Sequence, residues 1–274
     1  MSIIRLSGGL GNQIFQYCFG MFLQNEIGQE SHFDVSQIKK FGRRLELDRI
    51  FTLKTIKTER FGRVLNPIDI ISEGPLIHNR EIKLQRDAIY SGNFVSPQYW
   101  EKRYNQTISM IEESLGHRGV AKLDSEIAMH VRRGDYFYSE KTRQIHGYCT
   151  DQYFLTALES AIVVNPSIEI AYVATDSPEL IRNLVKKIQA KGVTAIVVSE
   201  NDPVNLLRDL AAFRNFIGSN STFSWWAAAL YGPKLVYMPD EWFLIGNLGF
   251  NIKEQLTFKS FTLPNALTRS GVID

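Results

Sequence analysis

The chain has 274 residues, of which 44% are hydrophobic and 22% are charged. This composition is that of a globular protein, and it excludes intrinsic disorder and collagen-like repeats. Lysine and arginine together number 31 against 29 acidic residues, a near balance that argues against a protein whose main partner is nucleic acid. The length predicts one large domain or two modest ones.

The sequence predicts a cytoplasmic protein. Its two cysteines, Cys18 and Cys149, are too few for a disulfide framework and fit a reducing compartment. No stretch approaches the ~18 apolar residues of a membrane-spanning helix, and the first residues lack the pattern of a signal peptide. A basic stretch at residues 39–44 indicates a solvated surface or contact with an anionic membrane.

Strand and helix patterns alternate along the chain. Residues 3–6 predict a short strand, and the apolar spacing from Gln13 to Ile27 predicts a helix. Residues 29–123 contain several prolines and give no clear pattern. Further strands are predicted at 127–131, 168–174, 195–198, 215–218 and 234–238, and helices at 153–164, 178–191, from Asp202 onward and at 222–230. This alternation predicts an α/β fold with a parallel sheet, in which ligands bind beyond the carboxyl ends of the strands.

The first candidate site is the loop 8–13, GGLGNQ, between the first strand and the first helix. Glycines such as Gly11 let the backbone approach a ligand, and a helix N-terminus offers N–H groups to an anion. The amides of Asn12 and Gln13 are expected to donate to sugar or phosphate oxygens. A tight turn without a ligand is the alternative that the spacing alone leaves open.

The same loop partly matches a dinucleotide-binding fingerprint. Gly9 and Gly11 have the right spacing, and an acid, Asp34, follows at about the right distance, but Ile14 stands where the third glycine belongs. A phosphate-binding P-loop is excluded because no Lys-Ser/Thr pair follows. An NAD-dependent oxidoreductase is therefore an alternative, although it leaves the later motifs unexplained.

The second candidate site is HVRRGDY, residues 130–136, at the end of a predicted strand. Arg132 or Arg133 would project into a cleft there, where a guanidinium can bind phosphate oxygens bidentately. Asp135 is expected to orient that arginine or to accept a proton from a substrate hydroxyl. The alternatives are a surface Arg–Asp ion pair and, for His130, a hydrogen-bonded core histidine.

The third candidate site is GSNSTFSWW, residues 218–226, which ends a predicted strand and begins a predicted helix. Ser221 or Thr222 is expected to be the N-cap of that helix. Together with Asn220, these hydroxyl and amide groups and the helix N-terminus can bind a diphosphate. The two tryptophans are assigned to the core.

Two single residues add to these motifs. Asp176 follows a predicted strand and can accept hydrogen bonds from a purine base or a ribose, or cap the next helix; His146 is a further candidate. The sequence has no D-x-D triplet, no zinc-ligand spacing and no G-x-S-x-G elbow. An enzyme acting on a nucleotide sugar would then meet the diphosphate with arginine and a helix N-terminus, so no metal cofactor is expected.

Read together, GGLGNQIFQY, HVRRGDY and NSTFSWWAAAL resemble the bacterial α-1,2-fucosyltransferases of glycosyltransferase family 11, over residues 8 to about 240. The resemblance implies a GT-B-type fold with two Rossmann-like domains facing a central cleft. Residues 1–122 would form the acceptor-side domain with the glycine loop, and residues 123–274 the donor-binding domain.

The same resemblance implies GDP-β-L-fucose as the donor. It implies metal-independent transfer, with inversion, to the 2-hydroxyl of a terminal β-galactoside, in the synthesis of O-antigen or another surface polysaccharide. The partners would be GDP-fucose and a galactose-terminated glycan, with no nucleic acid. Contact with the inner face of the membrane would come through a lipid-linked acceptor. A carbohydrate-binding protein without activity is the alternative, which release of GDP would exclude.

The resemblance also implies roles for single residues. Arg132 would bind the β-phosphate, Asp176 would recognise the guanine with His130 close by, Ser221 and Thr222 would meet the diphosphate, and Asn12 would reach the fucose or a phosphate. For the general base, Asp135 is the first candidate and His146 the second. Glu140 is the third, since it lies ten residues after His130, as a proposed base does in core α-1,6-fucosyltransferases.

Overall fold

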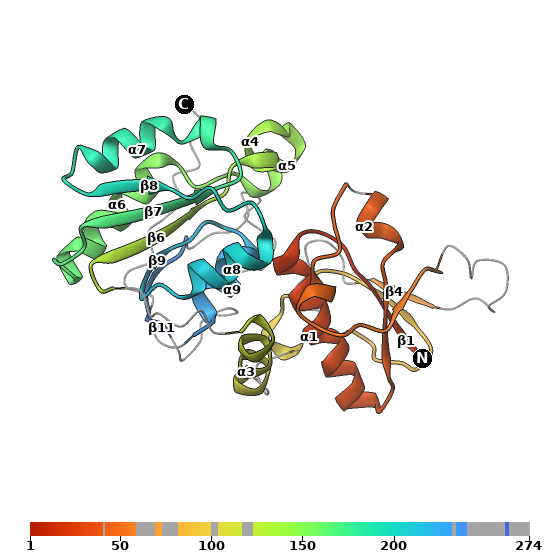
Figure 1. Ribbon diagram of the computed structural model, residues 1–274. Coiled ribbons are helices and arrows are strands. Elements are labelled where there is room, and N and C mark those ends of the chain that lie inside the picture. The colour runs from red at the N-terminus through yellow and green to blue at the C-terminus, as the bar shows by residue number, and fades with distance from the viewer. Residues whose placement is uncertain are drawn as a thin grey trace. The chain divides into compact units, whose positions relative to one another are not determined.

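The computed structural model describes residues 1–40, 42–58, 69–72, 82–99, 104–116, 123–231, 234–239 and 261–262. The chain divides into two compact units, Met1–Gly116 and His117–Asp274 (Figure 1). The sequence predicts the domain boundary after residue 122. Residues 117–122, which directly precede that boundary, lie outside the described residues. Each unit is built on its own parallel sheet, as the alternation of strands and helices predicts.

The first unit has a five-stranded sheet of order β3-β2-β1-β5-β4 in which every pair is parallel. Its elements are β1 (Ser2–Arg5), α1 (Leu10–Ile27), β2 (Ser31–Asp34), α2 (Ser36–Lys40), the 3-10 turn η1 (Leu47–Arg49), β3 (Thr55–Ile56), β4 (Ile70–Ser72), β5 (Ile89–Ser91), η3 (Pro97–Tyr99) and α3 (Tyr104–Leu115).

Helix α1 is the main packing element of this unit, and it contacts both β1 and β2. Its periodic apolar residues are buried, and Phe19 stacks on Phe94 with the ring centroids 3.8 Å apart. The helix ends at Gly28, which takes the left-handed conformation (φ +64°) that favours glycine at this position. The strands between residues 29 and 123 have two to four residues each, too few to show a period in the sequence.

The second unit has a six-stranded parallel sheet of order β11-β10-β9-β6-β7-β8. Its elements are β6 (Glu126–Val131), α4 (Gly134–Tyr138), α5 (Glu140–His146), α6 (Asp151–Val164), β7 (Ile170–Thr175), η5 (Pro178–Leu180), α7 (Arg182–Gln189), β8 (Thr194–Val197), α8 (Pro203–Ala211), β9 (Asn215–Ile217), α9 (Thr222–Ala229), β10 (Lys234–Tyr237) and β11 (Phe261–Thr262).

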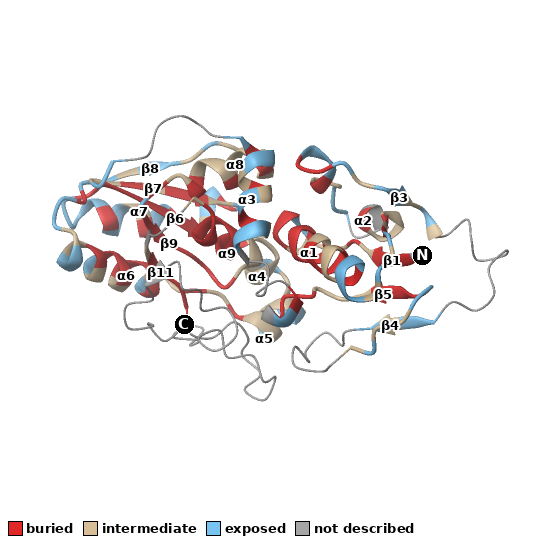
Figure 2. Cartoon of the chain, turned by 90° about the horizontal axis from the view of Figure 1, so that it is seen from below, coloured by how far each residue is buried: buried red, intermediate tan, exposed pale blue. Residues whose placement is uncertain are grey.

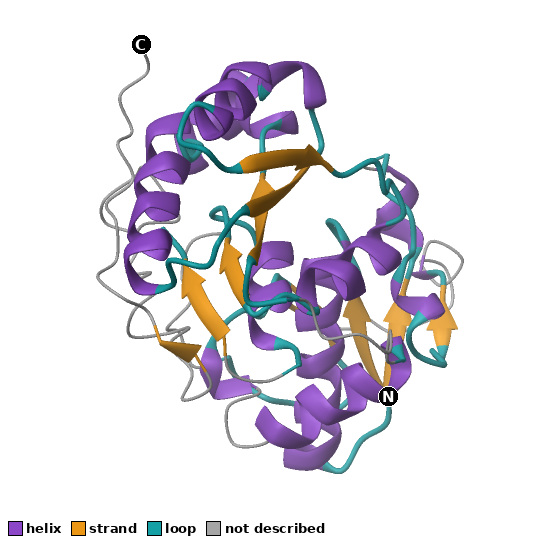
Figure 3. Ribbon diagram, turned by 60° about the vertical axis from the view of Figure 1, so that its left-hand side comes forward, coloured by secondary structure: helices purple, strands orange, loops and turns teal. Residues whose placement is uncertain are grey.

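Helices cover this sheet in two pairs, α6 with α7 and α8 with α9 (Figures 1 and 3). Right-handed crossovers place the pairs on opposite faces, because the chain runs from β6 towards β8 and then returns to the other side of β6. The α6–α7 side encloses a buried cluster that includes Val131, Phe154 and Leu158. Figure 2 shows the central strands buried and the edge strand β8 exposed.

The strands and most helices predicted in the second half are confirmed. Helix α6 ends at Val164, directly before Asn165-Pro166, and Asp202 caps α8 by accepting hydrogen bonds from the backbone N–H groups of Val204 (3.1 Å) and Asn205 (2.9 Å). The single helix predicted at 178–191 is wrong in its bounds, since a 3-10 turn precedes a shorter α7. The sequence also gave no sign of α4 and α5, which are too short for a helical period.

The strand order of both sheets reverses beside the first strand of each. In the second unit the reversal lies between β6 and β9, and in the first unit between β1 and β5. The carboxyl ends of strands at such a reversal are where open α/β sheets bind ligands. HVRRGDY begins with the last two residues of β6, GSNSTFSWW follows β9 and GGLGNQ follows β1, so each motif lies at a reversal point.

Candidate functional site

The two arginines that follow β6 have different environments. Arg133 is only 3% exposed, and its guanidinium donates to Asp151 Oδ1 (2.9 Å) and to the carbonyl of Cys149. Its Cζ also lies 5.0 Å from the centroid of the Tyr148 ring. Because this charge is paired and enclosed, Arg133 holds the fold together and is not presented to a ligand.

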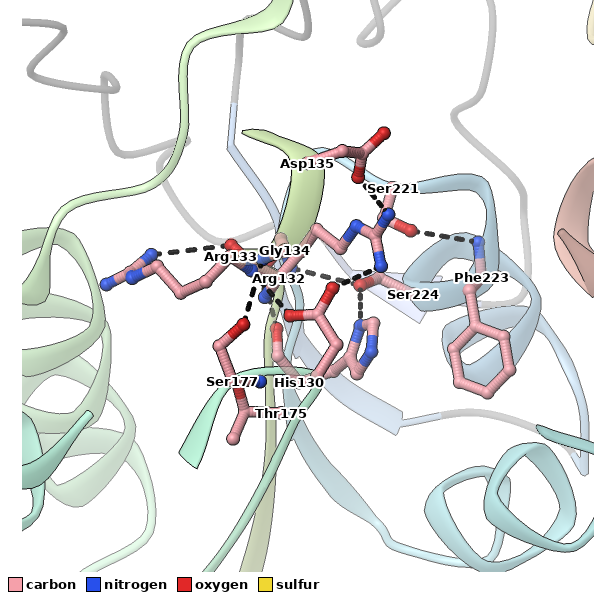
Figure 4. A network of polar contacts seen from close by, with 12 residues as sticks. His130, Arg132, Arg133, Gly134, Asp135, Thr175, Ser177, Ser221, Phe223 and Ser224 are labelled. Atoms are coloured by element: carbon pink, nitrogen blue, oxygen red, sulfur yellow. Dashed lines mark hydrogen bonds and ion pairs between the residues drawn. The ribbon is translucent and has the colours of Figure 1, made fainter. Parts of the chain in front are cut away.

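Arg132 lies at the strand end with its guanidinium between two carboxylates. Nη1 donates to Asp176 Oδ2 and Nη2 to Asp135 Oδ1, and Figure 4 shows Asp135 on one side of this group. The Arg132 side chain is 21% exposed. Of the two arginines that the sequence left open, Arg132 is therefore the one available to a phosphate. The prediction that Asp135 orients the arginine agrees with this ion pair.

Asp176 links the ends of β6 and β7. Its Oδ1 accepts a hydrogen bond from the backbone N–H of Arg133 (2.8 Å), while Oδ2 accepts from Arg132. The next residue, Ser177, accepts from the N–H of Gly134 through its Oγ (3.2 Å). The alternative that Asp176 caps the following helix is wrong, because the turn after it begins at Ser177 without a side-chain cap.

His130 is a buried histidine at the end of β6. Its Nδ1 shares a hydrogen bond of 2.7 Å with Ser224 Oγ, and its ring lies 5.0 Å from that of Phe223 (Figure 4). Desolvation, with a smaller contribution from the charge of Arg132, lowers the pKa of His130 to about 3. The imidazole is therefore neutral near pH 7, in keeping with a hydrogen-bonded core histidine.

Two serines that sequence reasoning missed attach the loop after β9 to the end of β6. Ser219 Oγ donates to the carbonyl of His130 (2.6 Å) and accepts from the N–H of Arg132 (2.8 Å). Ser224 Oγ accepts from the N–H of Ser219 (3.1 Å) and bonds the His130 ring. Both serines lie within the third candidate site, residues 218–226, and their hydroxyl side chains were the only feature of the sequence that could have marked them as site residues. They hold the second and third motifs side by side.

The N-cap of α9 is Ser221, one of the two residues predicted, with its Oγ accepting from the N–H of Phe223 (3.3 Å). Thr222 is the first residue of the helix. The Asn220 side chain is 2% exposed and reaches back to the preceding helices: Nδ2 donates to the carbonyl of His146 (2.9 Å) and Oδ1 accepts from the Cys149 thiol (3.6 Å). Asn220 thus shapes the loop that precedes α9.

The remaining candidate residues of this unit lie on α4 and α5. The centroid of the Tyr136 ring lies 5.4 Å from the guanidinium carbon of Arg132, and the ring of His146 stacks on Tyr136 with the centroids 4.8 Å apart. Tyr136 was missed because an aromatic residue after an arginine motif gives no specific signal. Glu140 is exposed, and its hydrogen bond among the described residues comes from Gln144 (3.2 Å). Among the described residues, Glu140 makes no hydrogen bond or ion pair with Arg132, Asp135 or Asp176.

In the first unit, the glycine loop is a tight turn held by buried amides. Gly8 has φ +74° and Gly9 is the N-cap of α1, which begins ahead of Gly11 and Asn12. Gln13 is fully buried, and its Nε2 donates to the carbonyls of Gly8 (3.1 Å) and Arg44 (2.9 Å).

Gln13 also uses its amide oxygen within the fold. Its Oε1 accepts from the backbone N–H groups of Glu46 (3.0 Å) and Leu47 (3.2 Å). Since an amide nitrogen has two hydrogens, both donors of this side chain are taken. The expectation that Gln13 donates to a ligand is therefore wrong.

Asp34, the acid that an NAD site would require, is used within the fold. It has no exposed surface, and its oxygens accept from Thr58 Oγ1 (2.6 Å) and from the backbone N–H groups of Ser36 and Thr58. Burial alone would raise the pKa of Asp34, but these hydrogen bonds outweigh it and hold the pKa below its usual range. A carboxylate so engaged has no free edge for a ribose.

Two wider features of the described residues bear on cofactors and membranes. No group of three or more His, Cys, Asp or Glu side chains among them is arranged to hold a metal ion. No helix in the same part of the chain is both long and apolar enough to cross a bilayer.

Comparison with known proteins agrees with the motifs. The family model "Glycosyl transferase family 11" matches residues 97–243. An α-1,2-colitosyltransferase of Escherichia coli is 24% identical over 89% of this chain and 93% of its own length. The O-antigen biosynthesis glycosyltransferase WbnK of Escherichia coli is also 24% identical, over 93% of this chain and 98% of its own length.

A solved structure has a similar fold. A mutant of FUT1 from Arabidopsis thaliana, in complex with GDP, superposes with a TM-score of 0.50 at 12% identity, over 86% of this chain and 69% of that one. With a parallel sheet in each unit, the expected α/β class, a GT-B-type fold of two Rossmann-like domains, is confirmed.

The Gln13 contacts predict a large loss of stability when the amide is removed. Gln13→Leu fills a similar volume but leaves four backbone groups without their partner, so the free energy of unfolding should fall by about 2–4 kcal/mol. Gln24→Leu, at an exposed position of the same helix, should change it by less than about 0.5 kcal/mol. Urea unfolding followed by circular dichroism measures both, and equal effects would contradict the assignment.

The environment of His130 predicts a specific pH dependence of stability. Its pKa is about 6.5 in the unfolded chain and about 3 in the folded one. Between about pH 3 and pH 6.5 the imidazole is therefore protonated in the unfolded chain and neutral in the folded one. Stability contributed by the neutral ring is fully present above pH 6.5 and falls by about 1.4 kcal/mol for each pH unit below it. In His130→Gln this contribution is absent, so its unfolding free energy should vary less between pH 6.5 and 4. Parallel profiles would refute the assignment.

Proposed function

The chain belongs to glycosyl transferase family 11, and we propose that it transfers L-fucose from GDP-β-L-fucose to the 2-hydroxyl of a terminal β-galactoside, with inversion. The relative named α-1,2-colitosyltransferase supports the linkage and a 6-deoxy sugar of this type, since colitose is L-fucose without its 3-hydroxyl. The GDP in the FUT1 structure of similar fold supports a GDP-linked donor.

The observation that carries this proposal is the position of Arg132. Its partly exposed guanidinium lies at the strand-order reversal, and the loop that leads to the capped N-terminus of α9 is bonded to the same strand end. A fixed cation and a helix N-terminus in one place are the elements that bind a diphosphate. The proposed donor presents a diphosphate as its leaving group.

The mechanism follows from where charge develops. In an in-line displacement the acceptor oxygen attacks opposite the departing GDP, so negative charge grows on the diphosphate while the sugar becomes oxocarbenium-like. Arg132, the hydroxyls of Ser221 and Thr222, Asn220 in its loop and the α9 N–H groups would meet that charge. Donors held in place before the reaction need no reorganisation, which makes this the larger catalytic contribution.

For the general base we propose Asp135. Its carboxylate pairs with the guanidinium proposed to bind the donor, and it belongs to the same motif. His146, stacked on Tyr136, is the second candidate, and exposed Glu140 is the third. His130 is unsuited to this role because burial keeps it neutral and hydrogen-bonded to Ser224.

The wider setting of the reaction is also a proposal. Gly11 and Asn12 of the first unit would contact the fucose or a phosphate, and that unit would provide the acceptor side. The relative WbnK is named for O-antigen biosynthesis, which supports a polysaccharide repeat as acceptor. Such an acceptor on a lipid carrier would place the enzyme in the cytoplasm, at the inner face of the membrane.

The proposal is tested by ligand-induced thermal shifts and by GDP release. GDP and GDP-fucose should raise the melting temperature, by mass action on the folded state, with or without EDTA. GDP-mannose and NAD serve as comparison ligands, and GDP-colitose distinguishes a colitosyl from a fucosyl donor. Release of GDP with a galactoside acceptor would exclude a mere carbohydrate-binding protein. Stabilisation by NAD alone would overturn the proposal in favour of an oxidoreductase.

Arg132 variants test the phosphate contact directly. Arg132→Ala should lower kcat/KM by at least about a hundredfold, the usual effect of removing a donor that faces transition-state charge. Arg132→Lys should restore only part of the activity, because an ammonium lacks the planar fork of a guanidinium. Far-UV circular dichroism should show both variants folded. A folded Arg132→Ala enzyme with normal activity would refute the assignment.

A further inference from the structure

Arg132 is held at its edges by two carboxylates. Nη1 donates to Asp176 Oδ2 and Nη2 donates to Asp135 Oδ1. Gly134, which has φ +30°, leaves room for the first of these contacts, because a Cβ placed on it would overlap Asp176 Oδ2. Both acidic side chains are partly exposed, Asp176 by 28% and Asp135 by 41%. Ion pairs of exposed side chains are weak and are screened by salt, so these contacts fix the guanidinium only in part.

A third contact of Arg132 comes from an aromatic ring. Its Cζ atom lies over the ring of Tyr136, 5.4 Å from the centroid, which is within the range of a cation–π interaction. The attraction comes from the negative potential of the ring face and needs no hydrogen bond. A guanidinium has five N–H donors, and in the part of the chain that the structure describes, the two carboxylates use two of them. The ring therefore holds Arg132 while three donors stay available to a ligand.

The ring also differs from the carboxylates in charge. A diphosphate brings negative charge to the guanidinium, and the two acids repel that charge while a neutral ring does not. Tyr136 can therefore keep its contact with Arg132 when a diphosphate binds. A side chain that is held before the ligand arrives loses less conformational entropy on binding.

Tyr136 is itself fixed by a neighbouring ring. The imidazole of His146 stacks on it with the centroids 4.8 Å apart and an angle of 16° between the ring planes. His146 ends α5, and its carbonyl accepts a hydrogen bond from Asn220 Nδ2 (2.9 Å). Asn220 is buried in the loop before α9. A row of contacts thus runs from that loop through His146 and Tyr136 to Arg132.

The adjacent arginine offers a matched contrast. Arg133 has its Cζ 5.0 Å from the centroid of the Tyr148 ring, so each of the two arginines has a tyrosine against it. Arg133 is buried and paired with Asp151, so the contact of Tyr148 supports the fold. Arg132 and Tyr136 are both half-buried, which leaves their pair within reach of a ligand.

We propose that Tyr136 is a positioning residue whose ring orients the guanidinium of Arg132 for the diphosphate of the donor. This inference rests on the proposed function in one respect, that Arg132 binds the β-phosphate. GDP carries that phosphate and GMP does not, so the ratio of the two affinities reports the Arg132 contact. Tyr136 should change this ratio through its ring and not through its hydroxyl.

The test is the affinity of the full chain for GDP and for GMP, measured by titration calorimetry at fixed ionic strength. Tyr136→Leu replaces the ring by an aliphatic side chain. It should reduce the preference for GDP by about threefold or more, the ratio to which the weaker cation–π contacts correspond. Tyr136→Phe keeps the ring and should keep the preference. In an Arg132→Ala background, Tyr136→Leu should have no further effect on the ratio, because the two residues act through one contact.

Fluorination of the ring separates its electrostatic role from its packing. Phenylalanine with one, two or three ring fluorines at position 136 keeps nearly the same shape, while each fluorine makes the ring face less negative. The preference for GDP over GMP should fall stepwise along this series. The same series at position 148 should lower the melting temperature through Arg133 and leave the preference as in the wild type.

His146 variants test the support of the ring. His146→Ala removes the stacking partner of Tyr136 and should lower the preference for GDP by less than Tyr136→Leu does, because the cation–π contact itself remains. His146→Phe provides a ring in the same place and should restore the preference. Since these are binding measurements, they do not depend on a role of His146 as a base.

The outcomes separate the inference from the proposed function. A preference that Arg132→Ala abolishes but that Tyr136→Leu and the fluorinated series leave intact overturns the inference alone. A Tyr136→Phe variant that loses as much preference as Tyr136→Leu also overturns it, since the hydroxyl would then be responsible. If Arg132→Ala keeps the preference for GDP over GMP, the phosphate contact itself is overturned, and the inference with it.

Discussion

The strand end at β6 has to keep two adjacent arginines in opposite environments, and the arrangement of the surrounding loops and helices of the second unit depends on this. Successive residues of an extended chain point to opposite sides, so one guanidinium enters the unit while the other stays at its edge. The inner charge is paired with Asp151 and enclosed, which anchors the start of α6 to the sheet. The outer charge stays at the surface, where a ligand can reach it.

In both units, buried polar side chains support the loop at the point where the strand order reverses. In the second unit the support comes from small hydroxyls, Ser219 and Ser224, and from the amide of Asn220. In the first unit it comes from the long amides of Gln13 and Gln16, which satisfy backbone groups of distant loops. Buried polar groups with every bond made are rigid, and they keep such loops in one conformation.

The sequence predicted the parts of this fold whose signals are local. The strand into HVRRGDY, the Ser221 cap and the Asp202 cap follow from a few neighbouring residues. It did not reveal the partners of Gln13 or Asp176, because their contacts join segments that are distant along the chain, and a polar residue in a loop looks the same whether it faces solvent or the backbone. The short strands of the first unit, like helices α4 and α5, contain too few residues to show a periodic pattern of apolar positions.

Gly134 has a consequence for how the family can change over time. The space that its missing side chain leaves is filled by the carboxylate of Asp176, which follows β7, so the two positions are not independent sites of substitution. A larger residue at 134 would need 176 to shorten or move, and the φ of +30° at Gly134 disfavours a side chain there in any case. We therefore expect relatives that carry an aspartate at 176 to retain the glycine at 134.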